Sequence, residues 1–311
     1  MKYDFFDKMQ EMATKLEKTF NSTSDTISDT ISDVISDTIN ESQKFMLNWK
    51  CPYYESSCKL ENCDCAKYKA YAKVNEPGMV EQTLIDNGFD PNQETWPLIM
   101  NMQKSFASRL HKMDDLTKEE TDYWIDKYLV CIEDEVRELR EHLDIYNNKN
   151  NQGCSQAEYE KSIEELKKEV IDILHFVMDV FLCGGVTAEI IKDNYLKTYA
   201  SNVKDTHDFI GFAYVSQKGH PFNFGQISND DYILKLSCKL LDASSEVRQQ
   251  ISWKHWKKPS PTIDQEKLLT AFTKLFKALI DLFVATMTAE DIRDIYIKKN
   301  CENIWRQNFN Y

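Results

Sequence analysis

Apolar residues recur along most of the chain every three to four positions rather than at every second position, and this period predicts helices. The clearest case is KKEVIDILHFVMDV, residues 167–180. Its Asp172 is surrounded by five apolar residues, Ile171, Ile173, Leu174, Phe176 and Val177. Only 8 glycines and 7 prolines occur among the 311 residues, so few positions break helices. The pattern predicts an all-α protein built as a helical bundle.

Two successive predicted helices carry acidic residues one turn apart. The segment CIEDEVRELREHL (131–143) contains Glu135 and Glu138, and the apolar segment after it contains Glu169 and Asp172. Residues three apart project from one face of a helix. Two antiparallel helices packed through those faces would bring four carboxylates together in the bundle core. Salt bridges to basic residues of the same helices are the alternative explanation, but the apolar surroundings of the second pair favour a converging site.

Such a site has a definite chemistry. Four carboxylates at close range cannot all stay ionised without a cation. Ligands that are all oxygen suit a hard ion such as Mg2+ or Mn2+. Magnesium held in this way keeps positions open for water and phosphates and can lower the pKa of an attacking water. The pattern indicates metal-dependent cleavage of a nucleotide polyphosphate. His175, in the same segment, is expected to be a core histidine rather than a partner of the metal ligands.

The chain contains an internal repeat. VTAEIIKDNYLKTYASN (186–202) aligns without gaps with MTAEDIRDIYIKKNCEN (287–303), and a Glu-Val-Arg triplet recurs farther upstream in each copy. The two alignments differ by ten residues in offset, a difference assigned to residues 144–162, which are expected to form a loop. Two degenerate copies of one helical unit, residues 91–207 and 208–311, are the simplest account.

The two copies differ in their acids. The four acidic positions of the first copy stand opposite Glu246, Gln249, Thr270 and Thr273 of the second. The first copy therefore keeps four carboxylates and the second keeps one. A solvated helix face would not explain so sharp a difference, which favours a specific site in the first copy.

Residues 1–90 are expected to form an N-terminal extension. The segment DTISDTISDVISDTIN (25–40) repeats every four residues and predicts an amphipathic arm. Four cysteines follow closely: Cys51, Cys58, Cys63 and Cys65. Four thiols could hold one tetrahedral Zn2+. Their spacing matches no common zinc finger, so reduced surface or core cysteines are the alternative.

Composition narrows the class of protein. The net charge is −13 and no long basic run is present, which argues against general nucleic-acid binding. No stretch approaches the ~18 apolar residues that span a bilayer, and the first residues lack the apolar region of a signal peptide. We therefore expect no membrane association, a cytoplasmic location (the host cytoplasm if the protein is viral), and mostly reduced thiols among the nine cysteines.

The motifs together resemble the all-α nucleoside triphosphate pyrophosphohydrolases, the superfamily of MazG-like proteins and dimeric dUTPases. EVREL, EVIDILHF and NYLKTYASN carry this resemblance, and MQKSFASRL (102–110) resembles the helix that contacts the substrate base in phage members. The C-terminal YIKKNCENIWRQNFNY is similar to the KN-x2-N-x2-RQ-x2-GY signature of dimeric dUTPases. The resemblance covers about residues 95–311 and leaves the N-terminal extension without a counterpart.

The resemblance implies specific roles. It assigns Mg2+ ligation to Glu135, Glu138, Glu169 and Asp172, and activation of the attacking water to Glu135. It implies that Gln103 contacts the base and that Lys299, Asn303 and Arg306 contact phosphates. The reaction of the superfamily attacks the α-phosphorus of a deoxynucleoside triphosphate and releases a monophosphate and pyrophosphate. The expected protein is a homodimer that converts dUTP to dUMP.

Two features depart from the dimeric dUTPases. Their Trp-Lys segment normally lies between the two acidic motifs, whereas the similar ISWKHWKKPSP (251–261) lies in the second copy, and the chain ends in NFNY rather than NxGY. These departures weaken the choice of dUTP more than the choice of reaction, so dCTP or a modified deoxynucleotide is the alternative substrate. A catalytically weak nucleotide-binding protein that acts on a protein partner is a further alternative, although the complete set of acids favours catalysis.

The C-terminal signature with Lys299, Asn303 and Arg306 (the tail) is complete only in the second copy, whereas the set of four acidic residues is complete only in the first. The sequence therefore predicts one composite site per chain, with the acids of the first copy facing the tail of the second.

Overall fold

The computed structural model describes residues 66–110, 115–151, 155–200, 230–252 and 264–309, and within these ranges the regular structure is helical, without a strand. The predicted all-α class is therefore confirmed. The chain divides into two compact units, Val74–Ile304 and a smaller one made of Met1–Lys73 with Trp305–Tyr311. The acidic helices and most of the expected site residues belong to the larger unit.

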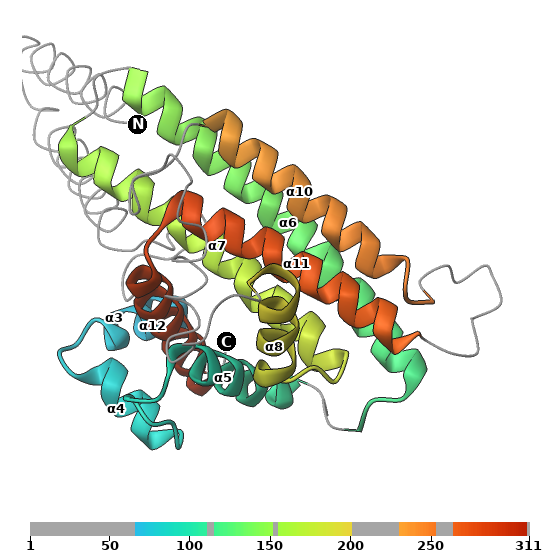
Figure 1. The fold of residues 1–311 in the computed structure, drawn as a ribbon. Coiled ribbons are helices and arrows are strands. Elements are labelled where there is room, and N and C mark those ends of the chain that lie inside the picture. Colours follow the sequence, from blue (N-terminus) through green and yellow to red (C-terminus); the bar gives the residue numbers. More distant parts are fainter. Residues whose placement is uncertain (1–65, 111–114, 152–154, 201–229, 253–263, 310–311) are drawn as a thin grey trace, which may run out of the picture. The chain divides into compact units, whose positions relative to one another are not determined.

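The larger unit holds the helices that matter for the site (Figure 1). They are α4 (Met79–Asp86), α5 (Thr95–Leu110), α6 (Lys118–Asn151), α7 (Gln156–Cys183), α8 (Ala188–Tyr199), α10 (Asp230–Arg248), α11 (Gln265–Thr286) and α12 (Ala289–Asn308), whose last residues pass into the smaller unit together with α3 (Ala66–Val74). In the smaller unit, Trp305 stacks on Phe309 with ring centroids 5.6 Å apart.

Four long helices form the core of the larger unit. Helix α6 packs against α7 and α10 packs against α11. The second pair packs on the first through α11 against α7 and through α10 against α6, which run alongside each other in Figure 1. Most apolar residues of α7 are buried, although Phe176 is half-buried, and α11 is buried along almost its whole length from Leu268 to Thr286. Helix α5 packs against α7 and α8, and α8 packs against α11. This packing fixes the face of α7 that carries the acids against α6.

The expectation of a loop over residues 144–162 was wrong. Helix α6 continues to Asn151 and α7 begins at Gln156, and the two helices pack against each other. The start of α7 is set by a capping box, in which the carboxylate of Glu158 accepts hydrogen bonds from the Ser155 backbone N–H at 3.1 Å and hydroxyl at 2.8 Å. The loop was inferred from the ten-residue difference between the two repeat offsets, but most of this stretch is helical.

The repeated segments adopt the same local structure. Helices α8 and α12 both begin after a threonine: the Thr187 hydroxyl accepts from the Ile190 N–H at 3.3 Å, and the Thr288 hydroxyl accepts from the Asp291 N–H at 3.0 Å. The aligned residues Tyr195 and Tyr296 are both buried. These matches agree with the repeat, while the division into two duplicated units stays a prediction.

Several expectations concern residues outside the described ranges. The cysteine cluster and the repeat at 25–40 lie there, so the zinc site and the amphipathic arm stay predictions. Among the described residues, Cys131, Cys183, Cys238 and Cys301 have free thiols. In the same part of the chain no single helix is long and apolar enough to cross a membrane, although α7 and α8, bent by 102° at their junction, meet that test as a pair.

The junction after α7 yields a stability prediction. Gly184 caps α7 in a conformation open to any residue, but a methyl group there would overlap the ring of Phe272 on α11. We expect Gly184→Ala to lower the free energy of unfolding by about 1–3 kcal/mol, the usual range for overpacking. Urea denaturation in the wild type and in a Phe272→Leu background measures this. The glycine substitution should have a smaller effect with leucine at 272; equal effects in both backgrounds would rule out the steric explanation.

Candidate metal centre

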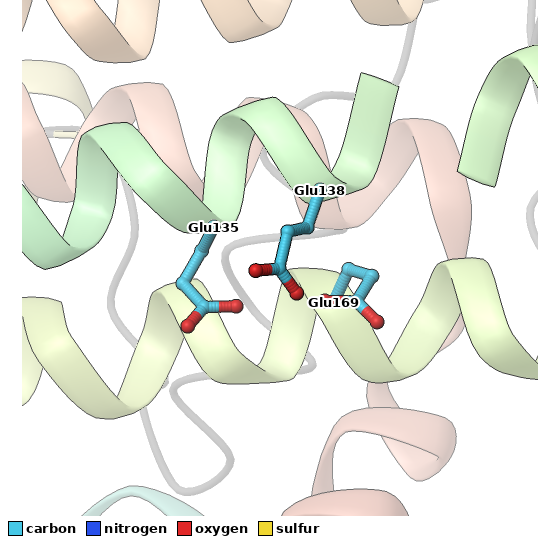
Figure 2. Close-up of side chains that lie close together, drawn as sticks. All are labelled: Glu135, Glu138 and Glu169. Carbon is cyan, nitrogen blue, oxygen red and sulfur yellow. The ribbon is translucent and has the colours of Figure 1, made fainter. Parts of the chain in front are cut away.

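The acidic residues of α6 and α7 face each other across the helix pair (Figure 2). Glu135 and Glu138 extend from α6 toward α7, and Glu169 extends from α7 toward them. One carboxylate oxygen from each of the three lies within 4.8 Å of the others. All three side chains are half-buried. The structure therefore brings together three of the four predicted ligands in a group compact enough to hold one metal ion.

The fourth acid, Asp172, forms an ion pair with Lys299 of α12 through a very short contact. Each of the two side chains is 21% exposed. Asp172 lies one turn after Glu169 on α7, and its charge raises the pKa of both Glu135 and Glu169. Lys299 was predicted to contact phosphates, and the structure places its ammonium group beside the acids. Its role toward a substrate stays a prediction.

Burial and the negative charges of neighbouring acids raise the pKa values of two carboxyl groups in the cluster. Burial, and then the charges of Asp172, Glu169 and Glu138, raise the pKa of Glu135 from 4.5 to about 8, although Lys299 lowers it. Burial and the charge of Asp172 raise the pKa of Glu169 to about 7, and Lys299 again acts in the opposite direction. Without a divalent cation, the protein therefore holds these carboxylates partly protonated near neutral pH.

A histidine that the sequence did not single out also borders the cluster. The Nε2 atom of His142 lies 3.3 Å from the Oε1 atom of Glu169. His142 is one turn after Glu138 on α6, and this spacing in the sequence could have indicated that it lies on the same face as the acids. An imidazole in this position can orient the carboxylate of Glu169 as a donor next to a metal ligand.

A buried polar layer lies beside the cluster, where α5, α7 and α12 meet. The Gln103 amide group donates to Asp179 Oδ1 at 2.9 Å, and its oxygen lies 2.7 Å from both the His175 Nδ1 atom and the donating Tyr296 hydroxyl. His175 stacks on Tyr296 with ring centroids 4.4 Å apart. Gln103 is only 1% exposed, and its predicted contact with a base stays a prediction.

The ionisation of this layer follows from its burial. Burial, aided by the charge of Lys299, lowers the pKa of His175 to about 3, so its ring is neutral. Burial raises the pKa of Asp179 from 3.8 to about 7, against the hydrogen bond from Gln103. His175 is the buried core histidine that the sequence suggested. Asp179 was missed because it stands in a segment that was interpreted by its apolar residues.

The remaining predicted residues lie on α12. Asn303 is one turn after Lys299 and is half-buried. Arg306 belongs to the smaller unit, so its predicted contact with phosphates stays a prediction.

The second helix pair does not repeat the cluster. Glu246 of α10 forms an ion pair with Lys274 of α11 at 2.5 Å. The hydroxyls of Thr270 and Thr273 donate to carbonyl oxygens of their own helix at 2.8 and 2.7 Å. The difference in acid content that the sequence predicted therefore corresponds to a difference in chemistry between the two pairs.

The donor set of the first pair fits Mg2+. The three converging groups supply oxygen atoms only, and the raised pKa values of Glu135 and Glu169 reflect a concentration of negative charge that a divalent cation would neutralise. The charges of Glu135, Glu138, Glu169 and Asp172 together exceed the single charge of Lys299. The site thus has both the ligand type and the electrostatic need for such an ion.

The polar layer predicts how stability depends on pH. An acid whose pKa rises on folding stabilises the folded state below its unfolded pKa, and this contribution disappears as the pH rises through its folded pKa. For Asp179 that window runs from about 3.8 to about 7. Relative to the wild type, Asp179→Asn should become more stable by roughly 2–3 kcal/mol between pH 5 and pH 8, at about 1.4 kcal/mol per pKa unit. Urea denaturation at both pH values, with the exposed Asp193→Asn as control, measures this; a constant difference would contradict it.

Comparison with known proteins agrees with the geometry. A family model described as dUTPase matches residues 95–311, which extend from the start of α5 to the end of the chain and contain the acidic cluster, the polar layer and Lys299. Searches among curated proteins and among solved structures gave no match. The family model covers well over half of the chain, and the chain therefore belongs to the dUTPase family of nucleotide hydrolases.

Proposed function

We propose that the protein is a Mg2+-dependent deoxynucleoside triphosphate pyrophosphohydrolase that converts dUTP to dUMP and pyrophosphate. The observation that carries this proposal is the convergence of carboxylates from α6 and α7 beside a lysine of α12, in a chain of the dUTPase family. Glu135, Glu138, Glu169 and Asp172 would hold the metal. When bound, Mg2+ would neutralise phosphate charge and lower the pKa of an attacking water.

The side chains around the cluster supply the other requirements of the reaction. Glu135 would accept a proton from the attacking water at a carboxylate oxygen. The water oxygen would form a bond to the α-phosphorus, and the bond from this phosphorus to the bridging α–β oxygen would break, so that pyrophosphate leaves. Lys299, together with Asn303 and Arg306, would contact the phosphates and stabilise the charge that develops on them.

The polar layer supports recognition of a base close to the cluster. Gln103 belongs to this layer, and Asn300 lies on α12 one turn after Tyr296. Asn300 is fully buried, and its carboxamide has no partner of good hydrogen-bond geometry among the described residues, although it lies close enough to the Tyr296 hydroxyl to lower the pKa of that group. A buried amide that can both donate and accept matches the alternating donor and acceptor atoms of a pyrimidine edge.

The first test is a screen of the common nucleoside triphosphates with Mg2+, in which nucleotide products, pyrophosphate and orthophosphate are measured separately. We expect the highest kcat/KM for dUTP, with equal amounts of dUMP and pyrophosphate, and loss of activity on addition of EDTA. Preference for dCTP or a modified deoxynucleotide would correct the substrate and leave the reaction intact. Orthophosphate as the first product, or binding without turnover, would contradict the proposed reaction.

A charge-removing substitution tests the ligand set. Glu169→Gln preserves the shape of the side chain but removes a charge that the metal would neutralise, so we expect kcat to fall by at least about a hundredfold, the scale for losing one strong electrostatic interaction in a transition state. The melting temperature without divalent cations should stay the same or rise, because one of several like charges is removed. The matched control is Glu164→Gln, which changes an exposed acid of the same helix. Similar kcat values for both variants would exclude Glu169 from the site.

A further inference from the structure

Lys299 reaches the acidic cluster from a helix that does not belong to the acidic pair. Its ammonium group forms an ion pair with Asp172, one turn after Glu169 on α7. It therefore places a positive charge at the edge of the group of carboxylates. In the absence of a metal ion, this lysine partly supplies the positive charge that the cluster requires.

The neighbouring basic residues on α6 and α7 make different contacts. Arg137 lies on the exposed side of α6 and divides its contacts among Asp134, Glu141 and Glu138. Lys168 pairs with Glu164 and Glu165 one turn earlier on α7. Lys167 pairs with Asp291 at 2.8 Å. None of these ion pairs involves Asp172, which pairs with Lys299 of α12.

Helix α12 is held in place by contacts that do not involve Lys299. Arg293 donates to the carbonyl oxygens of Pro91 at 2.6 Å and Gln93 at 3.0 Å, next to α5. The pair between Lys167 and Asp291 ties the start of the helix to α7, and the Tyr296 hydroxyl ties its middle to the polar layer. A lysine side chain has four rotatable carbon–carbon bonds, and its ammonium group accepts any anionic partner within its reach.

We propose that Lys299 is a tethered cation that occupies Asp172 in the metal-free protein and moves to the nucleotide phosphates when a divalent cation takes its place. This proposal rests on the proposed function and adds a coupling between metal and nucleotide. A divalent cation must compete with Lys299 for Asp172, which weakens metal binding to the empty protein. A bound nucleotide offers the ammonium group another anion and so removes the competition. Each ligand therefore tightens the binding of the other by the same factor.

The first experiment measures Mn2+ binding without nucleotide, by electron paramagnetic resonance of the unbound ion. The variants are Lys299→Met, which removes the competitor, and Lys299→Arg, which keeps it. We expect Mn2+ to bind Lys299→Met at least about fivefold more tightly than the wild type, the lower end of typical coupling between sites, and Lys299→Arg to resemble the wild type. The matched control is Lys298→Met, which loses the same charge from the adjacent exposed position and should change the affinity less than twofold.

The second experiment repeats the titration with saturating α,β-imido-dUTP, whose bridging nitrogen resists hydrolysis. In the wild type the nucleotide should raise the affinity for Mn2+ strongly. In Lys299→Met the increase should be smaller by about the factor gained without nucleotide, because the competition is already absent. Circular dichroism verifies the fold of each variant, and Lys299→Gln provides a second uncharged side chain if the methionine variant does not fold.

The outcomes separate the two proposals. Absence of Mn2+ binding in the wild type, with and without nucleotide, would overturn the metal centre itself. Equal affinities of the wild type, Lys299→Met and Lys299→Gln would overturn the tethered cation and leave the metal centre standing. An equal gain from Lys298→Met would also overturn it, because a general change in net charge would then explain the result.

Discussion

Carboxylates that converge between two packed helices repel one another, and burial strengthens this repulsion because little water remains to screen it. The pair α6 and α7 operates under this constraint. Its acids stand one turn apart on each helix and cannot separate, since the apolar residues between them are fixed in the core. Burial and this repulsion together raise the pKa values of Glu135 and Glu169. The surrounding structure supplies positive charge and hydrogen-bond donors to this place: Lys299 from α12 and His142 from α6.

The rest of the fold keeps this unfavourable arrangement in place. Helix α7 carries its site acids on one side and mostly buried apolar residues elsewhere, and α11 packs against it with an almost entirely apolar surface. Helix α12 is pinned by Arg293 and by Tyr296, and both contacts determine where Lys299 stands. The apolar packing therefore provides the stability, and the polar contacts of α12 provide the position. Lys299 and Asp172 are 127 residues apart in the chain. Their contact therefore requires both the apolar packing of the helices and the polar contacts that position α12.

The predictable part of this structure is the part that depends on local spacing. The all-α class follows from the period of the apolar residues, and the facing acids follow from their separation by three positions on each helix. The loop predicted over residues 144–162 came from the difference between the two repeat offsets, whereas α6 continues to Asn151 and the capping box at Ser155 sets the start of α7. The polar layer could not be predicted, since Gln103, Asp179 and Tyr296 meet only after three helices pack. Asp179 lies in a segment whose apolar positions dominate the pattern, and Tyr296 lies in a helix with many charged residues, so neither segment indicated a shared polar layer.

The second helix pair shows what the fold requires in the absence of a site. Helices α10 and α11 pack side by side as α6 and α7 do, yet their corresponding positions hold threonines that bond to their own backbone and a glutamate neutralised by Lys274. The Lys274 and Glu246 side chains are both well exposed, so neither bears a large desolvation penalty. Packing of such a helix pair therefore needs no cluster of acids. The mutual repulsion of the carboxylates on α6 and α7 lowers the stability of the folded protein, and the pair α10 and α11 avoids this cost. A cation that binds the carboxylates explains why they are present, because its binding stabilises the folded state.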